Sequence, residues 1–287
     1  MRIAVVAPSS RFGEEAAAQV RTIAQRTHPD VALYFHPQCF LTHNHFAGTD
    51  AARRDALIEV ANDPSFDAIW FARGGYGACR IAEEAIARMG SAARAKAWLG
   101  YSDAAFLLAG LYKAGFGHVA HGPMPQDAMR EGGDEAITRA LAWLVDRAPD
   151  TLESGLEPEG RHAAFNAAVL GMLLGTPLEP DFAGHVLLIE EVSEAMYAFD
   201  RAMFHISSSA NVRRAAGLRL GRVSDVRPND PDFGEDEEEI VRRWCTRAGI
   251  PFLGRADIGH DAANKVVPFG PPRDQGAGGG AVGAGSV

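Results

Sequence analysis

The chain has 287 residues, of which 47% are hydrophobic and 23% are charged, and its formal net charge is −9. This length favours two compact domains, and the composition is that of an ordinary globular protein. The acidic balance, without a concentrated basic stretch, argues against nucleic acid as a partner. The first apolar run, IAVVA, is too short for a signal peptide, and no stretch is long enough to cross a bilayer, so we expect a cytoplasmic protein with no membrane partner. Three widely spaced cysteines imply no disulfide framework.

The first half of the chain alternates strand and helix patterns. Strands are predicted over residues 2–8, 31–36, 66–72 and 96–101, and helices over 13–27, 50–63, 79–89 and the segment after residue 102. Asp50 is placed to cap the second of these helices. Short apolar strands separated by helices indicate an α/β fold with a doubly wound, flavodoxin-like parallel sheet. Reactive groups of such sheets gather at the carboxyl ends of the strands.

The pattern changes between about residues 127 and 161, where a polar-faced helix is followed by a loose, turn-rich connector. We therefore assign residues 1–145 to an N-terminal α/β domain, 146–162 to a linker, 163–272 to a smaller C-terminal α/β domain and 273–287 to a flexible glycine-rich tail. In the second domain, strands are predicted over 185–191, 218–226 and 251–260, and helices over 193–212 and 233–249.

A serine lies where the fourth predicted strand meets the following helix. Ser102 has a small residue two positions before it, Gly100, and two after it, Ala104. A sharp strand-to-helix elbow requires such residues, and it would expose the serine as a nucleophile. A serine at this position can also be a plain helix cap, which is the commoner of the two.

A glycine-rich loop, Arg73–Gly77, also joins a strand to a helix. Its backbone N–H groups suit an anion, either a phosphate or the oxyanion of a tetrahedral intermediate. A tight turn is an equally good interpretation, and the spacing fits no phosphate-binding motif. Cys79 follows in the first turn of a helix, where it is a rival nucleophile, although a packing role is the simpler reading.

A nucleophilic serine needs a base and an acid that orients the base. His260 ends a strand-like run and is preceded by a glycine, so it can reach a site above the sheet. Glu190 and Glu191 end the apolar run HVLLIEE, and a partly buried acid there would suit a histidine partner. The histidine pairs at 43/45 and 118/121 lack a third ligand in register, so we expect no metal.

Several segments together, in order, resemble the LD-carboxypeptidases of murein recycling, whose relatives include the microcin C immunity peptidases. The segments are VVAPSS, FAGTDAARRDAL, ARGGYGACRI, GYSDAAFLL, HGPM, GTPLEPDFAGHVLLIEEVSEAMYAFDR and GIPFLGRADIGHDAANKVVPFG. They cover nearly the whole chain to about residue 270.

The resemblance implies a serine peptidase whose active site lies in the groove between the two domains. It makes Ser102 the nucleophile, His260 the general base and Glu190 the acid that orients the base. The oxyanion hole would use the backbone N–H groups of Gly75 and Asp103. The bond cleaved would join an L-centre to the terminal D-alanine of a cytoplasmic murein tetrapeptide, without a metal or cofactor. The resemblance also implies a homodimer.

Three further residues are expected to contact substrate: Arg73, Tyr76 and Tyr101. The terminal carboxylate of the substrate needs a cation, for which the candidates are Arg73, Arg80, Arg201 and Lys265. Two alternatives stay open: a hydrolase of microcin-type peptidyl-nucleotides, and a ligand-binding relative without catalysis. All three triad residue types stand at the matching positions, which argues against the second alternative.

Overall fold

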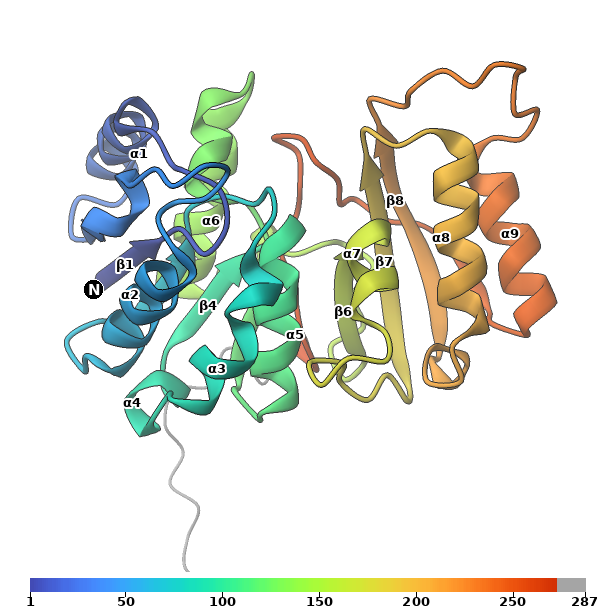
Figure 1. The fold of residues 1–287 in the computed structure, drawn as a ribbon. Helices are drawn as coiled ribbons and strands as arrows, with labels where there is room; N and C mark the ends of the chain where they lie inside the picture. The colour runs from blue at the N-terminus through green and yellow to red at the C-terminus, as the bar shows by residue number, and fades with distance from the viewer. Residues whose placement is uncertain (273–287) are drawn as a thin grey trace, which may run out of the picture.

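The computed structural model of the protein describes residues 1–272, so the predicted glycine-rich tail lies outside the described residues. Two α/β units lie side by side (Figure 1). The elements of the first unit, apart from short 3-10 turns, are β1 (Arg2–Val6), α1 (Glu14–Thr27), β2 (Ala32–Phe35), α2 (Asp50–Asn62), β3 (Ala68–Phe71), α3 (Ala82–Ala87), α4 (Ser91–Arg94), β4 (Ala97–Gly100), α5 (Ala105–Lys113), β5 (His118–His121) and α6 (Gly133–Asp146). Those of the second unit are β6 (Arg161–Asn166), α7 (Ala167–Leu173), β7 (His185–Val192), α8 (Met196–Ser208), β8 (Gly217–Ser224), α9 (Glu237–Ala248) and β9 (Phe252–Arg255).

The first sheet has the strand order β10-β5-β4-β3-β1-β2, in which β10 is Val267–Pro268 and β1 to β5 are parallel. This is the flavodoxin-like order, and it reverses between β1 and β3, where a crevice forms at the carboxyl ends of the strands. The second sheet, β6-β7-β8-β9, is entirely parallel. The predicted α/β class with a doubly wound parallel sheet and a second α/β unit is therefore confirmed.

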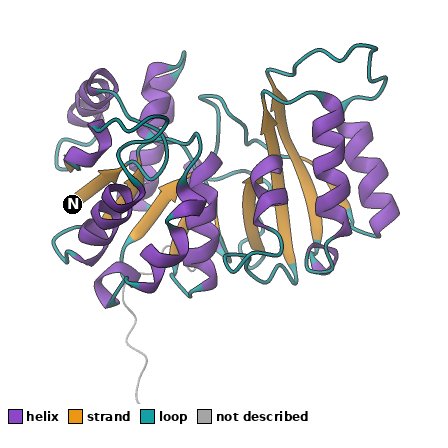
Figure 2. Cartoon of the chain, in the orientation of Figure 1, coloured by secondary structure: helices purple, strands orange, loops and turns teal. Residues whose placement is uncertain are grey.

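Helices cover both faces of the first sheet (Figure 2). One apolar cluster lies between the sheet and α1 and α6, and a larger cluster lies on the other face beneath α2, α3 and α5. The larger cluster continues into the second unit, where it includes buried residues of α7, α8 and α9. The two units therefore share one hydrophobic core, which holds their facing sides together.

The end of the described chain joins the two units. β10 (Val267–Pro268) falls within the range assigned to the second domain, yet it pairs antiparallel with β5 of the first sheet. Two residues later, Gly270 exchanges backbone hydrogen bonds with His162 at the start of β6. The connector is also fixed, because Glu153 is buried and forms a two-point ion pair with Arg219 of β8. The expectation of a loose connector was wrong at this residue.

One local expectation needs correction. Thr49 caps α2, because its hydroxyl accepts a hydrogen bond from the N–H of Ala52, and Asp50 is the first residue of the helix. Asp50 instead forms ion pairs with Arg53 and Arg80. Among the described residues, no helix combines the length and the apolar character that crossing a membrane requires.

Candidate active site

Ser102 lies at a strained turn directly after β4. Its φ is +58°, in the left-handed region that a non-glycine residue rarely adopts, at a cost of about 1–3 kcal/mol. The 3-10 helix that starts at Ser102 is preceded by Tyr101, so Ser102 is not the helix cap. Gly100 allows this turn, because a Cβ there would lie 2.9 Å from the ring of Phe71. The local backbone is the predicted elbow, and strain of this kind persists where it serves a site.

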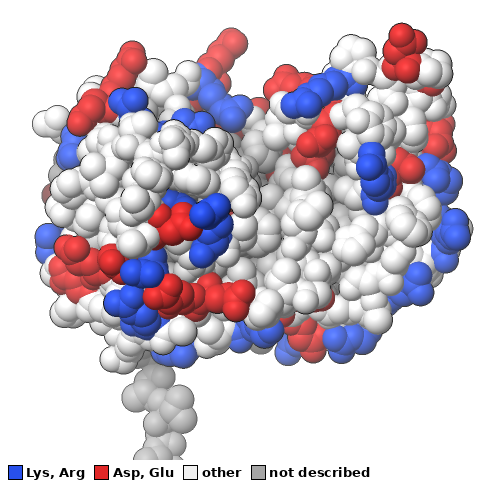
Figure 3. All heavy atoms as spheres, viewed as in Figure 1, with Lys and Arg blue, Asp and Glu red and all other residues white. Residues whose placement is uncertain are grey.

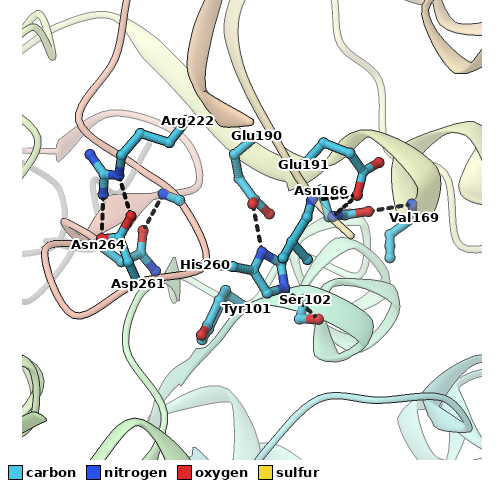
Figure 4. Close-up of polar contacts among 12 residues, drawn as sticks. Tyr101, Ser102, Asn166, Val169, Glu190, Glu191, Arg222, His260, Asp261 and Asn264 are labelled. Carbon is cyan, nitrogen blue, oxygen red and sulfur yellow. Dashed lines mark hydrogen bonds and ion pairs between the residues drawn. The ribbon is translucent and has the colours of Figure 1, made fainter. Parts of the chain in front are cut away.

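A continuous hydrogen-bonded chain connects Ser102 to the second unit (Figure 4). His260 Nε2 lies 3.0 Å from Ser102 Oγ, and His260 Nδ1 lies 2.6 Å from Glu190 Oε2. An ionised carboxylate only accepts hydrogen bonds, so Nδ1 donates to Glu190 and Nε2 is left to accept from the serine hydroxyl. The Glu190 side chain is fully buried and that of His260 is 9% exposed, so water does not compete for this bond.

Strand alternation separates the two glutamates of β7. Glu190 lies on the same face as Leu188, which packs against Ile258 close to His260. Glu191 lies on the opposite face, where its carboxylate accepts hydrogen bonds from Asn166 Nδ2 at 2.6 Å and from the N–H of Ala168 at 2.8 Å. Glu190 therefore contacts the histidine, and Glu191 fixes the start of α7.

The glycine-rich loop lies against the serine. A Cβ on Gly74 would be 2.8 Å from Ser102 Oγ, and one on Gly75, whose φ is +111°, would be 2.1 Å from Ser10 Oγ. Neither position has room for a side chain. The N–H of Gly75 and that of Asp103, the second residue of its 3-10 helix, have no partner within a helix or sheet and are suited to bind an oxyanion.

The side chain of Asp103 joins three loops beneath the site. Its Oδ2 accepts hydrogen bonds from Ser9 Oγ at 2.5 Å and from the N–H of Ala78 at 2.8 Å. Ser9 follows β1, Ala78 follows β3 and Asp103 follows β4, so one carboxylate fixes the loops at the crevice. Burial raises the pKa of Asp103, and the two hydrogen bonds oppose this effect.

The surroundings set the pKa of the candidate base and of the rival nucleophile. Burial opposes protonation of His260, but the charge and hydrogen bond of Glu190 outweigh it and raise the pKa of His260 above 6.5. Burial also raises the pKa of Cys79, and the charge of Asp103 adds to this effect. The Cys79 thiol is therefore protonated at neutral pH, which disfavours it as a nucleophile.

The two tyrosines expected to contact substrate lie in different surroundings. Tyr101 is 1% exposed, donates a hydrogen bond to Asp127 at 2.8 Å and packs its ring 4.9 Å from that of His260. The Tyr101 ring therefore packs against the imidazole of His260 and limits its movement. Tyr76 is 49% exposed and lies beside the rings of His45 and Phe46.

The four candidate cations for the terminal carboxylate also lie in different surroundings. Arg73 is adjacent in sequence to Gly74, is half-buried, and forms no ion pair among residues 1–272. Arg80 is paired with Asp50, Arg201 lies over the ring of Tyr197 in the second unit, and Lys265 lines a different pocket beside α6. Of the four candidates, Arg73 is the one that both lies in the glycine-rich loop and forms no ion pair among residues 1–272.

One histidine of each of the pairs 43/45 and 118/121 contacts a neighbouring side chain. Within the described part of the chain, no group of three or more His, Cys, Asp or Glu side chains could hold a metal ion. His45 contacts Ser10 Oγ at 3.2 Å, and buried His121 contacts Asn264 Oδ1 at 3.0 Å. Burial lowers the pKa of His121 to about 4.

A pocket of about 410 Å³ lies beside the oxyanion loop, between the two units. Gly75, Tyr76 and Phe106 line it from the first unit, and Val169 and Met172 line it from α7 of the second. In Figure 3 the surface between the two halves of the molecule carries few charged side chains. Ser102 precedes the connector and His260 follows it, so the hydrogen-bonded chain exists only when both units are docked.

Several residues that shape this site lie outside the motifs identified in the sequence. Arg130 donates a hydrogen bond to the carbonyl oxygen of His260 and lies 3.0 Å from Asp127. Arg222 of β8 contacts two aspartates that flank His260. The contacts of Arg130 and Arg222 with the segment around His260 join residues 35 to 130 positions apart, so no local spacing could have indicated them.

Comparison with known proteins agrees with this architecture. Residues 3–122 match the LD-carboxypeptidase N-terminal domain, and residues 159–272 match the LD-carboxypeptidase C-terminal domain. A protein of Synechocystis sp. named as a carboxypeptidase is 31% identical, over 94% of this chain and 89% of its own. The murein tetrapeptide carboxypeptidase of Pseudomonas aeruginosa is 25% identical, over 94% of this chain and 91% of its own.

A solved structure shows the same fold. The muramoyltetrapeptide carboxypeptidase of Oxalobacter formigenes superposes with a TM-score of 0.77 at 24% identity, covering 93% of each chain. The fold and the domain matches define a hydrolase of the serine carboxypeptidase type that is built from two α/β domains. The chain belongs to the LD-carboxypeptidase family.

Proposed function

We propose that the protein releases the terminal D-alanine from murein tetrapeptides by means of a Ser102–His260–Glu190 triad. The observation that carries this proposal is the unbroken contact from Ser102 Oγ through His260 to Glu190, in a chain of this family. The Pseudomonas relative, whose name specifies murein tetrapeptide, supports the substrate class.

In the proposed mechanism, Ser102 Oγ attacks the carbonyl carbon of the last peptide bond while His260 Nε2 accepts its proton. The N–H groups of Gly75 and Asp103 stabilise the oxyanion, and loss of one such donor typically costs about 10²–10³ in rate. His260 then protonates the amine of the departing D-alanine. A water molecule hydrolyses the acyl ester on Ser102, and His260 again transfers the proton. Glu190 holds the ring and stabilises its charged form.

Arg73 is proposed to bind the terminal carboxylate of the substrate, because it is the cation beside the oxyanion loop that has no acidic partner among residues 1–272. Its Nε is buried without a hydrogen-bond partner, and a carboxylate would satisfy it. Arg73→Gln is expected to raise KM for the tetrapeptide by about tenfold or more, while Arg80→Gln has a much smaller effect.

The decisive test of the substrate is a matched panel. The purified protein is incubated with murein tetrapeptide ending in D-alanine, with the same peptide ending in L-alanine, and with a peptidyl-adenylate. Release of D-alanine from the first alone supports the proposal. Preferred cleavage of the adenylate would instead favour the microcin-type hydrolase, with exposed Tyr76 available to stack on the base.

We further propose a cytoplasmic homodimer that acts in peptidoglycan recycling. Exposed apolar side chains of Met172, Tyr197 and Phe204 border one pocket of the second unit and offer a surface for a second copy. Light scattering at assay concentrations is expected to give twice the chain mass, and a monomer mass would contradict the dimer.

A further inference from the structure

We propose that Arg222 is a positioning residue, which sets the place of His260 by clamping both sides of the loop that carries it. This inference rests on the proposed triad. The guanidinium forms a two-point contact with Asp261, from Nε to Oδ2 and from Nη2 to Oδ1 at 2.9 Å, and its Nη1 lies 2.5 Å from Asp257 Oδ1. Asp257 and Asp261 flank His260, so one side chain contacts both ends of the loop. Figure 4 shows the contact of Arg222 with Asp261.

The backbone reinforces this clamp. The N–H of Arg222 donates to the carbonyl oxygen of Ile258 at 2.8 Å, so β8 and the loop are joined by main chain as well as side chain. Gly259 is required for the close approach, since a Cβ there would lie 2.8 Å from Arg222 Nε. A Cβ on Gly221 would lie 2.7 Å from the Ile258 oxygen and 2.9 Å from Glu190 Cβ. β8 thus passes close to both the acid and the loop of the base.

The first unit holds the same loop from its other side. Arg130 donates to the carbonyl oxygen of His260. His121 of β5 contacts Asn264 Oδ1 at 3.0 Å, and the same oxygen accepts a hydrogen bond from the N–H of Gly259 at 3.2 Å within the C-terminal segment. The aspartates that Arg222 holds are near the loop's outer face, with side chains 46% and 40% exposed at positions 257 and 261. Without the guanidinium, the loop would keep the main-chain bond from Arg222 to Ile258 and the bond from Asp257 N–H to Glu153 on one side of His260, together with the contact of His260 with Glu190.

The clamp matters for rate more than for stability. Partly exposed ion pairs contribute only about 0–1 kcal/mol each, so a variant at Arg222 is expected to fold. The distance from His260 Nε2 to Ser102 Oγ is 3.0 Å, and hydrogen-bond reach ends at about 3.2 Å, so a small displacement of His260 would break this contact. A displacement of about 1 Å can cost roughly a hundredfold in rate, so a loosened loop lowers kcat strongly.

The test uses the full chain and a matched control. Arg243 of α9 also bridges two acids, Asp200 and Glu235, and its side chain is 40% exposed against 31% for Arg222, but it does not touch the His260 loop. Arg222→Gln is expected to lower kcat for D-alanine release by about ten- to a hundredfold with KM nearly unchanged. Arg243→Gln is expected to keep kcat within about twofold while losing a similar amount of thermal stability.

A spectroscopic readout separates positioning from a general structural effect. The His260 Nδ1 proton shared with Glu190 is expected to give a low-field proton resonance, which broadens or shifts in Arg222→Gln but not in Arg243→Gln. Arg222→Lys should restore part of kcat, because it retains one ion pair, and Asp261→Asn should reproduce the loss if Arg222→Gln fails to fold. The inference would be overturned if Arg222→Gln and Asp261→Asn both kept kcat within about twofold of wild type. It would also be overturned if Arg222→Gln and Arg243→Gln lost kcat equally. His260→Ala is run alongside: full activity in that variant would refute the triad itself.

Discussion

Gly74 offers a sharp test of how the oxyanion loop meets the nucleophile. Its φ lies outside the left-handed region, so the backbone accepts an alanine, but the new methyl would lie 2.8 Å from both Cβ and Oγ of Ser102. Ordinary contacts begin at 3.4 Å, so the serine or the loop must shift by about 0.6 Å. The methyl would also come within 3.5 Å of the Asp103 nitrogen, in the space proposed for the oxyanion.

From this displacement we expect Gly74→Ala to lower kcat/KM for D-alanine release by about ten- to a hundredfold. Gly13→Ala is the control, because Gly13 has φ of −95° and no atom within 4 Å of its added Cβ. Initial rates and melting curves of both variants are compared with those of wild type. A kcat/KM for folded Gly74→Ala within about threefold of wild type would refute the proposed approach of the loop to the serine.

Three further predictions follow from the pKa directions and the hydrogen bonds. Wild-type kcat/KM should fall as pH drops through a midpoint above 6.5, because His260 must be neutral to act as a base. In Glu190→Gln the midpoint should move below 6.5, because burial then outweighs the smaller effect of the Glu191 charge, and an unmoved midpoint would contradict the pairing. Cys79→Ala should keep kcat/KM within about threefold of wild type in the same assay, because burial raises the pKa of the thiol and keeps it protonated. Loss of turnover in this variant would support Cys79 as the nucleophile. Tyr101→Phe should lower the free energy of unfolding by about 1–3 kcal/mol in chemical denaturation, because the buried carboxylate of Asp127 loses a hydrogen-bond donor. KM for the tetrapeptide should change little, and a large rise in KM would mean that Tyr101 contacts substrate.

Features encoded in short segments could be predicted from the sequence. The small residues around Ser102 indicated an elbow, and its positive φ is the backbone form of that elbow. Alternation in β7 implied that only one of two adjacent glutamates could face the groove, and the contact is made by Glu190. Each of these depends on the geometry of a few consecutive residues.

Features that depend on distant segments were not predicted. β5, with four residues, and β6, with six, lie on either side of the connector, and neither was identified from its sequence. The return of Val267–Pro268 to the first sheet depends on an open edge of β5, which no local pattern of the C-terminal segment reveals. The Arg222 clamp joins residues 35 and 39 positions apart, so only the folded chain brings them together.

The most direct measurement for the central claim is D-alanine release from murein tetrapeptide by wild type and by Ser102→Ala at equal concentration. The variant removes one hydroxyl from a turn, so both proteins should melt at similar temperatures. Wild type is expected to release D-alanine, and the variant is expected to be slower by about a thousandfold or more, because removal of a triad nucleophile leaves only binding and oxyanion stabilisation. Release by Ser102→Ala within about tenfold of the wild-type rate would contradict Ser102 as the nucleophile.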